Sequence, residues 1–126
     1  MTRPDWPTYF MNIAYAVAER SDCERDRVGA VIVKDRRIRS TGYNGSPSGL
    51  PGCSSCPRRN SSVVSGSNYD NCVAVHAEAN ALIYCDREDL QGAVLYVTRE
   101  PCVSCMKLIM GSGVDEVNWP EGGGIL

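Results

Sequence analysis

Hydrophobic and polar positions along the chain change period several times, from helical spacing to the short runs of buried strands. From Thr8, which we expect to cap a first helix, apolar side chains recur on one helical face: Phe10, Met11, Ala14, Val17 and Ala18. Short apolar or β-branched runs predict strands at residues 28–33, 38–43, 93–98 and 114–119. Helical composition predicts two further helices, at residues 75–84 and 101–111.

The order of these elements, α-β-β-α-β-α-β, predicts an α/β domain in which helices cover a mixed sheet. The polar turn at residues 34–37 joins the first two strands into a hairpin, and Pro101 suits the first turn of the last helix. Residues 44–72 are rich in turn-forming residues and predict a long loop, anchored by cysteines. Residues 120–126 read as a flexible end, and the 126 residues as a single domain.

Composition narrows the class of protein. Hydrophobic residues make up 43% and charged residues 22%, with no apolar run near the roughly 20 residues that cross a bilayer. Because no signal peptide is visible either, we expect a cytoplasmic protein without a membrane partner. A formal charge of −2, with Arg58-Arg59 as the compact basic pair, favours a small-molecule substrate over a nucleic acid.

Cysteine is unusually frequent for a chain of this kind. Seven cysteines, an odd number without a secretory signal, argue against a complete disulfide framework and favour metal binding or cysteine chemistry. The chain has one histidine, His76. A metal site must therefore use that residue or depend on sulfur.

Three short pieces together predict a catalytic zinc site. His76, Cys102 and Cys105 can supply three ligands and leave a fourth position for water, and the two cysteines share one face at a predicted helix start. Glu78 is then a non-ligand carboxylate that can take a proton from that water and return it to the substrate. Taken singly, a histidine on a helix is more often a packing residue, and a C-x-x-C pair can be a redox motif. In combination they match the H-x-E…P-C-x-x-C signature of zinc deaminases.

The chain resembles the cytidine/deoxycytidylate deaminase superfamily, and its dCMP deaminase branch in particular, from about Asn12 to Trp119. His76-Ala77-Glu78 and Pro101-Cys102 resemble the superfamily, and Gly42-Tyr43-Asn44-Gly45 followed by Ser46-Pro47 resembles the branch. Further matching pieces are Val28-Gly29-Ala30-Val31-Ile32 and Leu95-Tyr96-Val97-Thr98.

The resemblance implies hydrolytic deamination of a cytosine nucleotide, dCMP or a 5-substituted dCMP. Glu78 would protonate N3 while zinc-activated water attacks C4, and ammonia would leave. Substrate contacts are implied at Asn44 and Ala77, with Asn80 and Arg87 as further candidates on the helix. Asn80 could equally make a structural helix-to-loop hydrogen bond, and Arg87 could be an exposed residue at a helix end.

Relatives in this branch imply a second, structural zinc. Cys23 and Cys53 occupy the matching places, and Cys56 and Cys72 could complete a site of four cysteines. The alternative is that these are free thiols in a loop. Cys85 is expected to be a small buried residue outside any site.

The resemblance also implies a three-layer αβα cytidine-deaminase-like fold, here trimmed at its C-terminal end, and a homo-oligomer. A hexameric state and regulation by dCTP and dTTP carry over only weakly. Glu100 before Pro101 is also compatible with base and tRNA deaminases, so a nucleoside, a free base or a tRNA or DNA base remains an alternative substrate. A zinc-stabilised binding module without turnover is the second alternative, against which Glu78 argues.

Overall fold

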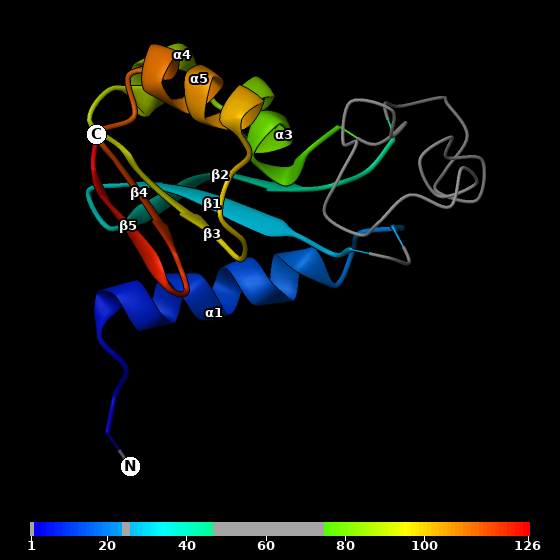
Figure 1. Cartoon of the computed structure of the whole chain (residues 1–126). Helices are drawn as coiled ribbons and strands as arrows, with labels where there is room; N and C mark the ends of the chain where they lie inside the picture. The colour runs from blue at the N-terminus through cyan, green and yellow to red at the C-terminus, as the bar shows by residue number, and fades with distance from the viewer. Residues whose placement is uncertain (1, 24–25, 47–74) are drawn as a thin grey trace.

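The computed structural model describes residues 2–23, 26–46 and 75–126. The chain forms one five-stranded sheet with helices on both faces (Figure 1). The elements are, in chain order, α1 (Trp6–Ala18), β1 (Gly29–Lys34), β2 (Arg37–Tyr43), α3 (Ala77–Ile83), α4 (Arg87–Leu90), β3 (Val94–Val97), α5 (Val103–Ser112), β4 (Glu116–Trp119) and β5 (Gly122–Ile125).

The sheet is mixed, as the sequence predicts. Its strand order is β2-β1-β3-β4-β5, and only β3 and β4 run parallel, whereas the other neighbours are antiparallel. Helix α1 lies on one face and the other helices lie on the opposite face, which gives the three layers (Figure 1). The predicted α/β class and layered architecture are confirmed.

A hydrophobic core fills the space on each side of the sheet. Phe10 and Ala14 of α1 pack against Val31 and Val33 of β1, so alternate residues of this strand face α1. Ala30 and Ile32 point the other way, into a larger cluster that includes α3 and α5. Because both faces are covered, β1 reads as a continuous apolar run rather than as an alternating one.

Three predicted helix ends are wrong by a few residues. Asp5 caps α1, and Thr8 donates its backbone N–H to Asp5 Oδ1 at 2.9 Å rather than capping the helix itself. Pro101 precedes the N-cap Cys102 of α5 instead of lying in the first turn. The same helix ends at Ser112 with Gly113 as its left-handed C-cap, so Gly111 does not end it.

The predicted flexible end at residues 120–126 is also wrong, because this segment contains β5. Residues 122–125 pair antiparallel with β4, and the backbone N–H of Leu126 donates to the Asp115 carbonyl at 2.8 Å. A Cβ at Gly123 would come within 2.2 Å of the Val117 carbonyl oxygen, so the glycine lets the chain return closely along β4. The glycine run, which in the sequence resembles a flexible tail, is thus what allows β5 to pair with β4.

Within the residues that the structure describes, no helix combines the length and the apolar character needed to cross a membrane.

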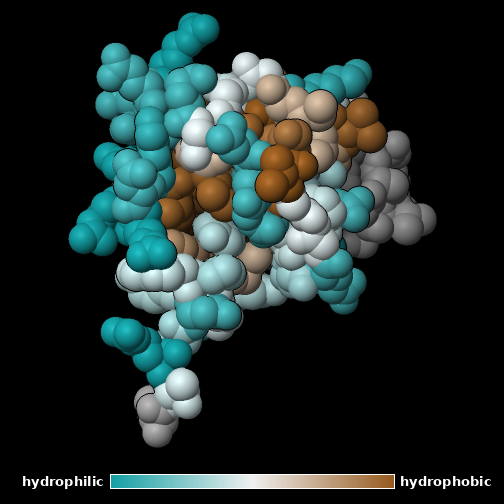
Figure 2. Space-filling model, turned by 90° about the vertical axis from the view of Figure 1, so that its left-hand side faces the viewer, coloured by the Kyte–Doolittle hydropathy of each residue, from teal (hydrophilic) through white to brown (hydrophobic). Residues whose placement is uncertain are grey.

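On the face seen in Figure 2, hydrophobic side chains gather in one central area, bordered by hydrophilic ones.

Candidate active site

Two helix N-termini bring the predicted zinc ligands together. His76 is the N-cap of α3 and Cys102 is the N-cap of α5, and neither side chain caps its own helix. The isolated bridge between Gly45 and Val75 fixes the chain just before His76. The ligand side chains therefore start from backbone positions set by the helices packed on the sheet.

The geometry of these three side chains fits zinc. His76 Nδ1 lies 3.2 Å from Cys105 Sγ and 3.6 Å from Cys102 Sγ, and all three candidate ligand atoms lie within 4.8 Å of one another. Tetrahedral zinc with ordinary Zn–N and Zn–S bonds separates a nitrogen and a sulfur ligand by about 3.6 Å. The ligand atoms are already placed at nearly the spacing that the metal requires.

The electrostatics of Cys105 also favour a cation at this position. Burial raises the pKa of its thiol, and the neighbouring Glu78 and Cys102 raise it further. A thiolate here is therefore unfavourable without a nearby positive charge. A zinc ion bound between the two sulfurs would supply that charge.

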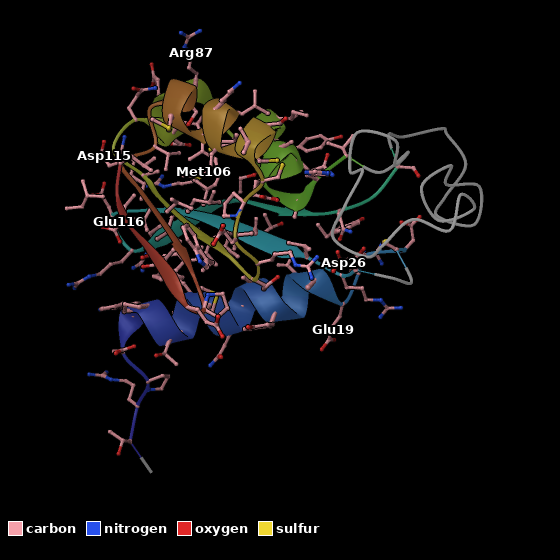
Figure 3. All side chains as sticks on the ribbon, viewed as in Figure 1. Glu19, Asp26, Arg87, Met106, Asp115 and Glu116 are labelled. Carbon is pink, nitrogen blue, oxygen red and sulfur yellow. The ribbon has the colours of Figure 1, made fainter. Side chains whose placement is uncertain are left out.

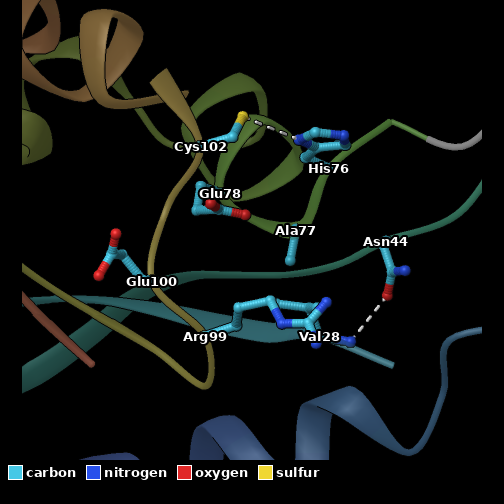
Figure 4. A pocket seen from close by; sticks show the side chains of 8 residues that line it. All are labelled: Val28, Asn44, His76, Ala77, Glu78, Arg99, Glu100 and Cys102. Atoms are coloured by element: carbon cyan, nitrogen blue, oxygen red, sulfur yellow. Dashed lines mark hydrogen bonds between the residues drawn. The ribbon is translucent and has the colours of Figure 1, made fainter. Parts of the chain in front are cut away.

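Glu78 belongs to the same site. It is buried, with 5% of its surface exposed, on the first turn of α3, and its carboxylate faces the pocket in Figure 4. Burial raises the pKa of this carboxyl, while a backbone hydrogen bond and the nearby His76 partly oppose the rise. A carboxyl whose proton is held more tightly than usual is suited to taking and returning protons.

A pocket opens beside these residues (Figure 4). Its lining comes from the β1 entry, the end of β2, the start of α3 and the link between β3 and α5. The lining residues are Val28, Asn44, His76, Ala77, Glu78, Arg99, Glu100 and Cys102.

Asn44, a predicted substrate contact, lines this pocket and is held by its own amide. Its Oδ1 accepts the backbone N–H of Val28 at 2.9 Å, and its Nδ2 donates to the carbonyl oxygen of Asp26. Ser21 Oγ donates to the Asn44 carbonyl at 2.8 Å. Asn44 thus ties together the segments that form one wall of the pocket.

The other predicted substrate contacts fall in different places. Ala77 lines the pocket and is fully buried. Asn80 Nδ2 donates at 2.8 Å to the carbonyl of Tyr43, the last residue of β2, so the side chain makes a structural bond, as in the alternative reading of the sequence, but to a strand end rather than to a loop. Arg87 is exposed at the start of α4, does not line the pocket and points away from the sheet in Figure 3.

Three pocket residues were not among the predicted site residues: Val28, Arg99 and Glu100. Arg99 and Glu100 stand on the link between β3 and α5, and Arg99 forms an ion pair with Asp26. Their place directly before Pro101-Cys102 is the signal that could have found them, since residues next to a ligand tend to line the same pocket.

The remaining cysteines divide into two groups. Cys85 is buried within the core cluster on the α3 side, as predicted. Cys23 is also buried, and its backbone N–H donates to Ser21 Oγ at 3.2 Å. Cys53, Cys56 and Cys72 lie outside the described residues, so the second zinc and the 44–72 loop remain predictions.

Comparison with known proteins places this site in a family. The family described as "Cytidine and deoxycytidylate deaminase zinc-binding region" matches residues 4–120. A deoxycytidylate deaminase of Mycobacterium phage D29 is 64% identical, covering 96% of this chain and 98% of its own length. The deoxycytidylate deaminase of Schizosaccharomyces pombe is 43% identical over 91% of this chain, which spans only 37% of that longer protein.

A solved structure agrees with these sequence relatives. The dCMP deaminase of cyanophage S-TIM5, in complex with dCMP and dUMP, superposes with a TM-score of 0.73 at 30% identity, covering 94% of this chain and 83% of that one. The family match spans most of the chain and includes all three candidate ligands and Glu78. The chain belongs to the zinc-dependent cytidine and deoxycytidylate deaminase family.

Proposed function

We propose that this chain catalyses the hydrolytic deamination of dCMP, in which dCMP and water give dUMP and ammonia. The observation that carries the proposal is the cluster of His76, Cys102 and Cys105 beside a pocket that Glu78 lines, in a chain 64% identical to a phage deoxycytidylate deaminase. A 5-substituted dCMP is the variant of this substrate that the proposal leaves open.

We assign the metal ligands to His76, Cys102 and Cys105. A zinc ion held by them would act as a Lewis acid and lower the pKa of a coordinated water to about 7. The three side chains come from two helix N-termini, where the positive end of each helix dipole lies beside the ligand atoms.

Glu78 is the proposed proton carrier. Its carboxylate would accept a proton from the attacking water and deliver it to N3 of the cytosine ring, while the water oxygen bonds to C4. The hydroxyl group formed at C4 would then give up its proton, which Glu78 would pass to the exocyclic nitrogen, so that the C4–N bond breaks, the C4 carbonyl forms and ammonia leaves. Burial of Glu78 supports this role, because the raised pKa keeps the proton available for the leaving amine.

The inner end of the pocket is suited to a small planar ring. Ala77 is fully buried and presents only a methyl group, so little volume is taken beside Glu78. Asn44 and Val28 form the opposite wall, fixed to each other by their hydrogen bond. We propose that these residues contact the nucleotide, with Asn80 acting through the position of α3 rather than by touching substrate.

We infer further that the protein is a cytoplasmic homo-oligomer. The four cysteines among the described residues are free thiols, which is the state that a reducing compartment maintains. Large apolar side chains are exposed at the C-terminal end of α3 and along α5, where a second copy could cover them: Ile83, Tyr84, Val103, Leu108 and Met110.

An ultraviolet assay of the zinc-loaded protein tests the proposed function. The substrates would be dCMP, 5-methyl-dCMP, deoxycytidine, cytidine, dCTP and guanine, each followed by the loss of its amino chromophore. We expect the highest kcat/KM for a deoxynucleoside monophosphate. Preferred turnover of a nucleoside or of guanine would contradict the substrate, and no turnover of any of them would contradict the proposed activity.

A further inference from the structure

We propose that Arg99 binds the 5′-phosphate of the substrate and thereby makes the enzyme select nucleotides over nucleosides. This inference rests on the proposed function, because it assumes that a cytosine nucleotide occupies the pocket. It assigns a role to a residue that the sequence motifs do not include.

The position of Arg99 is fixed by the fold. It lies on the short link between β3 and α5, three residues before the zinc-ligand candidate Cys102. Thr98 anchors the start of this link: its N–H donates to the Gly29 carbonyl at 3.0 Å, and its Oγ1 accepts the Gly29 N–H at 3.1 Å. The Arg99 side chain lies across the pocket from Glu78 and Cys102 (Figure 4).

The carboxyl groups around the pocket would repel a phosphate, so phosphate binding requires a positively charged side chain at this position. Among the described lining residues, Arg99 alone carries a permanent positive charge, whereas Glu78 and Glu100 have carboxyl groups. A phosphate dianion brought near these groups would be repelled unless a positive side chain received it. The planar guanidinium, with five N–H donors, matches phosphate oxygens better than any other side chain.

Asp26 holds the guanidinium at the rim of the pocket. Its carboxylate forms an ion pair with Arg99 Nη1, and its backbone carbonyl accepts Nδ2 of Asn44 in the pocket wall. The Arg99 side chain is 45% exposed, whereas that of Asp26 is 13% exposed, so the guanidinium is anchored on one side and reaches solvent on the other. A cation already held in place costs less ordering when a phosphate binds.

This arrangement predicts how the substrate lies. The cytosine ring points toward Glu78 and the zinc ligands, and the phosphate end lies at the outer rim beside Arg99. A nucleoside has no group for Arg99 to bind. The arginine therefore contributes to binding of the monophosphate and nothing to binding of deoxycytidine.

The test compares Arg99→Gln, which removes the charge, with Arg99→Lys, which keeps it. Arg87→Gln is the matched control, because Arg87 is exposed and lies outside the pocket. For Arg99→Gln we expect KM for dCMP to rise about 10- to 100-fold, with kcat within about threefold of wild type. Arg99→Lys should recover part of this loss, and Arg87→Gln should leave both constants unchanged.

A binding measurement separates this role from a structural one. Calorimetry with the zinc-loaded proteins should show dUMP binding weakened by Arg99→Gln to the same extent as KM, and deoxyuridine binding unchanged. Equal weakening of both ligands would overturn the proposal in favour of a structural ion pair, and so would an unchanged KM for dCMP. If the wild-type protein does not deaminate dCMP at all, the proposed function itself is wrong, which is a distinct result.

Discussion

Asn44 shows how much of the site depends on single hydrogen bonds. Both ends of its amide are used, the oxygen by the Val28 N–H and the nitrogen by the Asp26 carbonyl. These partners lie in the segment that leads into β1 and lines the pocket. A side chain expected only to touch substrate is therefore also what holds one pocket wall in place.

Replacing Asn44 by Ala should lower the free energy of unfolding by about 1–3 kcal/mol, because two partly buried backbone groups lose the side chain that pairs with them. Urea denaturation measures this change. Asn12→Ala, on the exposed side of α1, is the control and should change stability by less than about 0.5 kcal/mol. Equal effects of the two substitutions would show that the Asn44 bonds contribute nothing.

At the residue scale, the sequence alone predicts the three candidate zinc ligands, because their combination of residue types is rare. A chain with one histidine and a nearby carboxylate leaves few combinations for a metal site. Arg99 and Val28 were missed because their residue types are common at any surface or core. Only the fold shows that the β1 entry and the β3–α5 link meet beside Glu78.

At the scale of elements, the site depends on how closely α3 lies on the sheet. A Cβ at Gly42 of β2 would lie 2.4 Å from both the Ala77 carbonyl oxygen and the Ala81 nitrogen, which are backbone atoms of α3. Ser40 Oγ donates to the Ala81 carbonyl at 2.7 Å on the same side. Helix α3 carries His76 at its N-cap and Glu78 in its first turn, so this contact positions both.

Gly42→Ala should therefore destabilise the protein by about 1–3 kcal/mol and reduce deaminase activity, because α3 must move to admit the methyl group. Gly111→Ala is the matched control: it lies in α5, and its added Cβ would meet nothing within 4 Å. This control should stabilise the protein by about 0.5–1 kcal/mol. Thermal unfolding measures both, and a harmless Gly42→Ala would contradict the close packing of α3.

The elements themselves were largely predictable, while their ends were not. Apolar runs identify β1 and β3 because both strands are buried on both faces. The sequence predicts the hairpin turn. Asp35 and Arg36 in this turn adopt positive φ angles of 53° and 60°, which could not be predicted from their residue types. Strand β5 was missed because its stability comes from the edge of β4, a partner that local sequence does not reveal.

At the scale of the whole molecule, the layers of the fold determine where the chemistry lies. Helices α3 and α5 pack on the same face of the sheet, and their N-termini meet where His76, Cys102 and Cys105 converge. Residues 26 positions apart in sequence, His76 and Cys102, are brought to 3.6 Å between Nδ1 and Sγ. Sequence spacing suggested this meeting, and the packing of two helices on a common sheet explains it.

We propose that the three ligands hold zinc while Glu78 moves the protons, and one paired measurement tests both roles. Zinc content and dCMP turnover would be measured for wild type, Glu78→Gln and the control Glu88→Gln, whose side chain is exposed on α4. We predict that Glu78→Gln keeps its zinc and loses activity by about 10²- to 10⁴-fold, and that Glu88→Gln matches wild type. Loss of zinc from Glu78→Gln would make Glu78 a ligand, and retained turnover would remove it from the mechanism; either result contradicts the account.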